Sequence, residues 1–108
     1  MTTFDDRERA FEAKYARDEE MRFKIIARRN RLLGVWAAGL MGLTEAETEA
    51  YAKDVVRADF EEPGEGDVVR KLLGDLILAG VDVDEERIRD ALQQKEVQAR
   101  RQLIELQG

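Results

Sequence analysis

Four stretches with the apolar spacing of α-helices, separated by marked breaks, constrain the fold of this 108-residue chain more than any other feature. Apolar residues recur at intervals of three and four within residues 18–41, 45–60, 67–79 and 85–106. The breaks contain glycine, and residues 61–66 also hold the only proline. No run is long enough to indicate a β-strand. Because the connections are short, neighbouring helices should be antiparallel, and the sequence predicts an all-α fold, a small four-helix bundle.

Residues that favour helix ends accompany these breaks. Gly42 and Gly80 follow the first and third helices, where a glycine in the left-handed conformation ends many helices. Thr44 and Glu47 have the spacing of a capping box, in which each side chain bonds to the other residue's backbone N–H. Asp84 precedes the fourth helix and is its candidate N-cap. These residues place the expected helix ends.

The large apolar residues on the predicted inner faces are the candidate core. The third helix has little polar surface, so we expect it to be the most buried element. Trp36 shares a face with Ile25 and Leu32, which favours packing in the core over binding a partner. The candidate core residues are Met21, Ile25, Leu32, Trp36, Leu40, Tyr51, Val55, Val56, Phe60, Val68, Val69, Leu72, Leu73, Leu76, Ile77, Ile88, Leu92, Ala99, Leu103 and Leu106.

Composition argues against an enzyme. The chain has no cysteine, which excludes disulfides, thiol catalysis and zinc sites built on thiolates. It has no histidine, the commonest general base and the side chain that titrates near neutral pH. The many carboxylates are spaced as solvated helix faces and complete neither an EF-hand nor a phosphate-binding loop. We therefore expect no catalytic residue, no metal site and no cofactor.

Charge and hydropathy bear on partners and location. The formal net charge is −6, which disfavours binding to nucleic acid. No apolar stretch approaches the roughly 20 residues needed to cross a bilayer, so direct membrane insertion is not expected. Asp5 and Asp6 stand where a signal peptide would be basic, and no apolar segment follows them. A cytoplasmic location is therefore expected.

The first seventeen residues differ from the four helices. On a helical wheel Phe4, Phe11 and Tyr15 lie within roughly 40° of one another and form a narrow aromatic stripe. The remaining surface is charged, through Asp5, Asp6, Arg7, Glu8, Arg9, Glu12 and Lys14. Such a stripe is too thin to build a core, and an isolated helix of this length is marginal in water. The segment therefore gains most by folding on another protein.

An alternative is that this segment extends the first helix and packs on the bundle. On an unbroken helix, however, the aromatic stripe is out of phase with Met21, Ile25 and Leu32 by roughly 60–100°. We therefore favour two parts, a flexible N-terminal arm formed by residues 1–17 and a bundle formed by residues 18–108.

A basic run in the first helix has two interpretations. Five basic residues and no acidic residue lie between Met21 and Leu32, namely Arg22, Lys24, Arg28, Arg29 and Arg31. They would suit a phosphate or nucleotide contact surface, or a patch that docks on an acidic protein. They also suit a solvated helix flank paired with glutamates of the second helix. The second interpretation is favoured, because charged surface residues are the norm.

Three segments resemble the zeta inhibitor subunit of the F1Fo-ATPase of α-proteobacteria. They are residues 4–15 (FDDRERAFEAKY), 18–24 (DEEMRFK) and 27–38 (ARRNRLLGVWAA). The resemblance extends over essentially the full length, although the later helices match mainly in layout. It implies a four-helix protein whose mobile N-terminal arm inserts into the catalytic α/β interface of F1 near the central γ stalk and blocks ATP hydrolysis.

The resemblance also implies partners and roles. The partners would be the α, β and γ subunits, and the protein would lie at the membrane periphery through the F1Fo complex. Phe4, Phe11 and Tyr15 would be the apolar anchors of the arm, and its charged residues would fix the register. The mitochondrial ATPase inhibitor has a similar role, with histidine-dependent pH gating and a dimerising coiled coil. This chain lacks histidine and sustained C-terminal heptads, so weak pH control near neutrality and a free monomer are expected.

Two other functions remain open. One is a nucleotide-sensing helical module that binds ATP or ADP through the surface between Arg22 and Arg31. The other is a helical adaptor for an unrelated protein.

Overall fold

The computed structural model describes residues 6, 9–10, 13, 18–61 and 64–107. Within these residues the fold is all-α, with four helices and no strand: α2 (Glu19–Met41), α3 (Glu45–Glu61), α4 (Glu65–Leu78) and α5 (Glu85–Gln107). The predicted four-helix fold is therefore confirmed. Most of the predicted arm lies outside the described residues.

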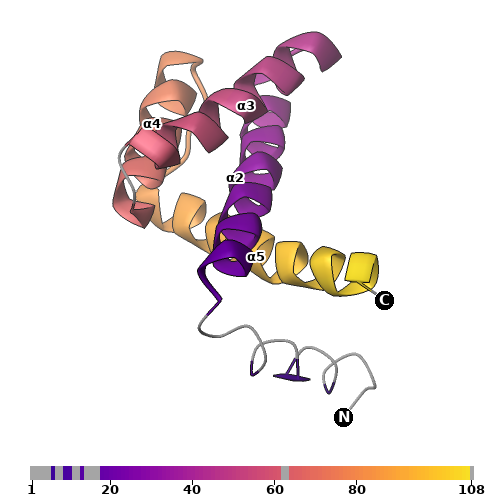
Figure 1. The fold of residues 1–108 in the computed structure, drawn as a ribbon. Coiled ribbons are helices and arrows are strands. Elements are labelled where there is room, and N and C mark those ends of the chain that lie inside the picture. Colours follow the sequence, from indigo (N-terminus) through magenta and orange to yellow (C-terminus); the bar gives the residue numbers. More distant parts are fainter. Residues whose placement is uncertain (1–5, 7–8, 11–12, 14–17, 62–63, 108) are drawn as a thin grey trace.

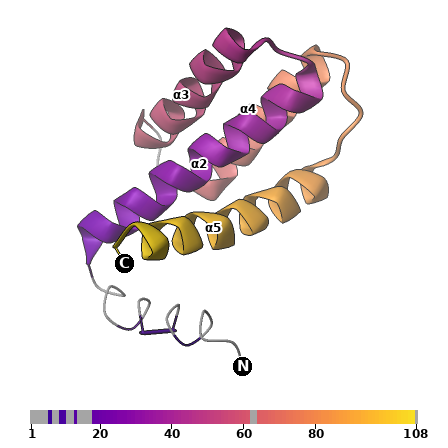
Figure 2. The same cartoon turned by 90° about the vertical axis from the view of Figure 1, so that its right-hand side faces the viewer.

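The bundle is organised around α2, which contacts each of the other three helices. Figure 2 shows α3 running back alongside α2, with α4 behind them and α5 crossing below. Near its C-terminal end, α5 packs against the beginning of α2 through Leu103, Ile104 and Met21, and Figure 1 shows α5 extending past α2. The bundle therefore has one end where α2 begins and α5 ends, and an opposite end where the 42–44 and 79–84 connections lie.

Local sequence signals set the helix ends as predicted. Gly42 and Gly80 have positive φ angles of 72° and 80°, which glycine adopts without strain. Thr44 and Glu47 form the capping box, because the Thr44 N–H donates to Glu47 Oε1 at 2.9 Å and the Glu47 N–H donates to Thr44 Oγ1 at 3.2 Å. The Arg87 N–H donates to Asp84 Oδ1 at 2.9 Å, so Asp84 caps α5. The start of α4 differs, since the helix begins at Glu65, inside the predicted loop.

The core consists of two clusters of buried side chains. The main cluster joins α2, α3, α4 and α5 around residues such as Leu33, Val55, Leu72 and Ile88, and Trp36 packs against it as predicted. A smaller cluster joins the beginning of α2 to the end of α5 through Met21, Leu103 and Ile104, with Ile25 packed against it.

The inner face of α2 includes small residues that its large apolar residues did not indicate. Leu33, Gly34, Ala37 and Ala38 are buried, whereas Leu40, predicted to face inward, is 37% exposed. A Cβ atom built on Gly34 would lie only 2.8 Å from the Cα atom of Ala52 in α3. The two helices approach this closely because small residues face each other. A count of large apolar residues therefore missed this part of the buried face.

Two further burial predictions are wrong. Ile77 is 58% exposed and Leu106 is 69% exposed, because each lies near the end of its helix. The third helix, α4, buries Val68, Val69, Leu72 and Leu76 as predicted, although Leu78 at its end is 87% exposed. A similar share of the residues of α2 is buried. The side chain of Phe60 lies outside the described residues.

Candidate functional site: the arm root and the basic groove

Asp6 and Arg9 are the only predicted arm contacts within the described residues. Both have helical backbone and both are exposed, as are Ala10 and Ala13. The other predicted contact residues lie outside the described part of the chain: Phe4, Asp5, Arg7, Glu8, Phe11, Glu12, Lys14 and Tyr15.

The start of α2 is well defined. Asp18 has extended backbone angles, φ −87° and ψ 104°, so the helical conformation of α2 does not include it. Its Oδ1 atom accepts the N–H of Met21 at 3.2 Å, which makes Asp18 the N-cap of α2. The first turn is then held by Met21, which is only 4% exposed against Leu103 and Ile104 of α5. The predicted start of the first helix near Asp18 is confirmed.

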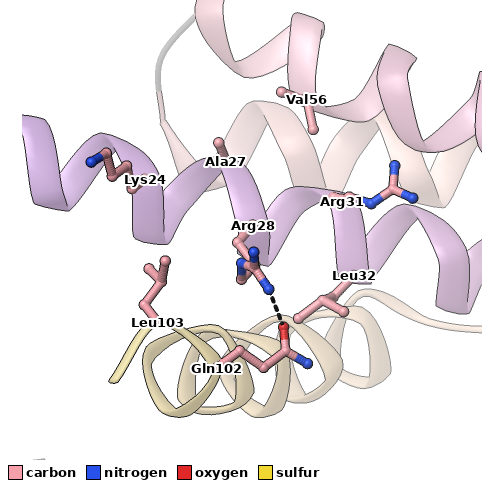
Figure 3. Close-up of a pocket in the computed structure, with 8 residues that line it drawn as sticks. All are labelled: Lys24, Ala27, Arg28, Arg31, Leu32, Val56, Gln102 and Leu103. Carbon is pink, nitrogen blue, oxygen red and sulfur yellow. Dashed lines mark hydrogen bonds between the residues drawn. The ribbon is translucent and has the colours of Figure 1, made fainter. Parts of the chain in front are cut away.

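Three of the five basic residues line a groove across α2. Lys24, Arg28 and Arg31 surround a hollow of about 530 Å³ between α2, α3 and α5 (Figure 3). The other lining residues are Ala27, Leu32, Val56, Gln102 and Leu103, so four of the five are apolar. We call this hollow the basic groove. It combines a cationic rim with an apolar floor.

Each cation of the basic groove already has a partner. The Nη1 atom of Arg28 donates to Gln102 Oε1 at 2.9 Å across the groove (Figure 3). Arg31 donates two hydrogen bonds of 2.8 Å to the carboxylate of Glu49 in α3. Lys24 Nζ lies 3.6 Å from Glu20 Oε1, a longer contact between exposed groups.

The Arg31–Glu49 pair shifts the pKa of each group so that its charged form is favoured. Hydrogen bonding to Glu49 raises the pKa of Arg31, and the same bonds lower the pKa of Glu49. The predicted pairing of the basic run with glutamates of the second helix is confirmed for Arg31.

Arg29 does not belong to this surface. It is 3% exposed, and its Nε atom donates to Asn30 Oδ1 at 3.1 Å. Its Nη1 atom lies 3.2 Å from Glu96 Oε1 in α5 and 3.6 Å from Glu65 Oε1 at the start of α4. Glu96 also pairs with Arg100 at 3.1 Å. Arg29 therefore ties three helices together.

The sequence contained one signal for this buried position. Arg29 and Asn30 lie one helical turn before Leu33 and Gly34, on the face that is buried. Arg22 lies apart from the groove as well, beside a smaller hollow that Glu19, Phe23 and Ile26 also line.

The described residues contain no cluster of three or more carboxylates arranged to hold a metal ion. None of the helices in this part of the chain is long and apolar enough to cross a membrane.

Comparison with known proteins gives the context for this geometry. Residues 1–102 match the family model of the ATPase inhibitor subunit zeta. A protein whose structure was solved in solution by NMR shares 44% sequence identity with the chain and superimposes with a TM-score of 0.70, over 79% of this chain and 96% of that one. Among proteins with curated descriptions, none matches the chain. The chain therefore belongs to the ATPase inhibitor subunit zeta family, a family of regulatory subunits of an ATPase.

Proposed function

We propose that the protein inhibits ATP hydrolysis by an F1Fo-ATPase, and that residues 1–17 form the inhibitory element. Membership of the inhibitor family supports an interaction with an ATPase complex. One structural observation supports the assignment of the inhibitory role to the arm. The two core clusters of the described residues close within residues 21–104, and α2 has its own N-cap at Asp18. The arm residues that the structure describes are exposed and belong to neither cluster, and in this proposal the aromatic stripe of the arm binds another protein.

In this proposal the arm enters the catalytic α/β interface near γ while that interface is open. Phe4, Phe11 and Tyr15 occupy apolar pockets, and the charged residues between them pair with charges of α, β and γ and fix the register. A segment that folds on capture loses conformational entropy only at that moment. Rotation in the hydrolytic direction then closes the interface on the arm and stops the motor. The bundle remains outside the interface and holds the arm in place.

ATP hydrolysis by a homologous F1 tests this proposal. The full chain, residues 18–108 alone, and a Phe4→Ala/Phe11→Ala/Tyr15→Ala variant are compared at equal concentrations. We expect inhibition by the full chain only, while circular dichroism shows the helical bundle in all three. An Ala13→Ser variant is the matched control, since it alters a small, exposed arm residue. Undiminished inhibition by residues 18–108 would refute the role of the arm.

The partners can be tested separately. A tagged full chain, incubated with a membrane extract, should recover the α, β and γ subunits, as expected for a protein that lies at the membrane periphery through the F1Fo complex. Recovery of an unrelated protein without these subunits would support the adaptor function instead.

The basic groove supports a second candidate function, the binding of ATP or ADP. Its rim offers Lys24, Arg28 and Arg31 to phosphates, and its floor offers Leu32 and Val56 to a base. Arg29 is excluded from direct contact in this arrangement, because its side chain is buried and paired.

Nucleotide titration with amide chemical shifts tests this second function. Shifts should centre on the groove-lining residues and weaken in a Lys24→Ala/Arg28→Ala variant. Arg22→Ala is the matched control, because Arg22 is a cation of the same helix outside the groove. Absence of shifts, or equal weakening by Arg22→Ala, would exclude the groove as a nucleotide site.

A further inference from the structure

We propose that Asp18 is a positioning residue that separates the helix of the arm from α2, so that the direction of the arm is not dictated by the bundle. This inference rests on the proposed function of the arm and assigns to a residue outside the arm a part in that function.

The geometry at Asp18 is that of a helix boundary. Its carbonyl already accepts the Arg22 N–H at 3.0 Å, while its own backbone is extended. Its side chain takes the Met21 N–H, a donor that would otherwise bond to the carbonyl four residues earlier if the helix continued toward the arm. Glu19 and Glu20 occupy the first turn, where negative charge suits the helix dipole. All three features favour a helix that begins here.

The residues that follow Asp18 in the first turns of α2 are held in place by packing in the smaller core cluster. Met21 is buried against Leu103 and Ile104, and Ile25 packs on the same cluster one turn later. The beginning of α2 and the end of α5 consequently lie side by side (Figure 2). A change in the direction of the arm need not disturb these contacts, because Asp18 precedes them in the chain.

The boundary matters because helical backbone exists on both sides of it. Asp6, Arg9, Ala10 and Ala13 are helical, and the arm is rich in the strong helix formers Ala, Glu, Arg and Lys. Without the cap, one helix could run through Asp18 from the arm into α2. The aromatic stripe would then point in a direction fixed by α2. The loss of an N-cap side chain shifts such an equilibrium about fivefold.

Distances between two spin labels test the separation directly. The chain has no cysteine, so Ala13→Cys and Val35→Cys, both exposed positions, can be labelled uniquely. A continuous helix would hold these two residues about 33 Å apart, at 1.5 Å per residue. We expect no dominant component at this distance in the otherwise unaltered chain. Asp18→Ala should introduce a narrow component there, whereas Asp18→Asn, which retains a capping side chain, should not.

Inhibition kinetics test the positioning role. With a homologous F1Fo-ATPase, Asp18→Ala in the cysteine-free chain should slow the onset of inhibition about fivefold, in proportion to the lost cap preference. Asp18→Asn should restore the onset to within about twofold. Asp84→Ala is the matched control, because it removes the corresponding cap of α5 and costs comparable helix stability, yet lies at the opposite end of the bundle. It should leave the onset unchanged.

The proposal is overturned if Asp18→Ala leaves both the label distances and the onset unchanged. It is also overturned if Asp84→Ala slows the onset equally, or if the label distances change without any change in onset, since Asp18 would then be only structural. Should the unaltered chain fail to inhibit, the proposed function of the arm is wrong. The label distances then report separately whether Asp18 keeps the two helices apart.

Discussion

Gly34 sets the distance between α2 and α3. Its missing side chain leaves room for the backbone of Ala52, and the γ2 methyl of Val55 lies 3.3 Å from where a Cβ would stand. Gly34→Ala should therefore destabilise the fold by about 1–2 kcal/mol, because overpacking costs about 1–3 kcal/mol and the gain in helix propensity offsets part of it. Urea unfolding followed by circular dichroism measures the change.

Gly39 provides the control for this prediction. It lies in the same helix, is exposed, and a Cβ atom built on it would meet no atom within 4 Å. Gly39→Ala should stabilise the protein by up to about 1 kcal/mol through helix propensity alone. Equal effects of the two substitutions would contradict the close packing at Gly34.

Arg29 and Arg31 are two residues apart, but their substitution should destabilise the fold by different amounts. Arg29 is buried and contacts two partly exposed carboxylates, so Arg29→Ala should destabilise the fold by about 1–3 kcal/mol, because it removes buried packing and the donor to the buried Asn30 Oδ1. Arg31 and Glu49 are about half exposed, so Arg31→Ala should cost much less, and high salt should reduce its effect further. Urea unfolding at low and high salt compares the two; a larger loss for Arg31→Ala would show that the burial is misassigned.

At the scale of elements, the capping box of α3 predicts a pH dependence. Hydrogen bonds from Thr44 lower the pKa of Glu47 below its usual value of 4.5, so the fold favours the ionised carboxylate. This contribution to stability is present above pH 4.5 and is lost as the pH falls through the lowered pKa. Glu47→Gln should therefore reduce the loss of stability below pH 4.5, measured by urea unfolding at several pH values.

Two further measurements test whether the acid sensitivity comes from Glu47. Glu86→Gln changes an exposed carboxylate of α5 outside the capping box and should leave the acid sensitivity of Glu47 in place. Between pH 6 and 8 the unaltered protein should keep nearly constant stability, since it has no histidine. A steep change in stability between pH 6 and 8 would contradict this explanation of the pH dependence.

α3 and α4 are joined by a polar contact. The Tyr51 hydroxyl donates to Asp75 Oδ2 at 2.7 Å, and Lys71 Nζ lies 3.1 Å from the same oxygen. Burial and this hydrogen bond raise the pKa of Tyr51, so the neutral phenol is the form that holds α3 to α4.

At the scale of the whole molecule, the bundle should fold without the arm. The buried side chains of the described core lie between Met21 and Ile104, and the described arm residues are exposed. Residues 18–108 should therefore unfold in urea in one transition, with a midpoint close to that of the full chain. A markedly lower midpoint would show that the arm packs on the bundle, and would weaken the proposed division between arm and bundle.

The sequence by itself determined the helices, most of their ends and the family resemblance. Periodicity, the Thr44–Glu47 capping box and the cap at Asp84 depend on residues three or four positions apart, so they can be recognised without knowing the tertiary structure. The aromatic stripe of the arm was likewise visible in the sequence, and its role stays a prediction until its partner is tested.

Only the tertiary structure decided which faces are buried and which cations are available. Leu40 lies outside and Arg29 inside because Gly34 lets α3 approach α2, and because Glu65 and Glu96 come from helices far along the chain. The basic groove has the same origin, since Arg28 meets Gln102 across 74 positions of sequence. Such contacts depend on how the helices pack against one another, and no local pattern of residues encodes that packing.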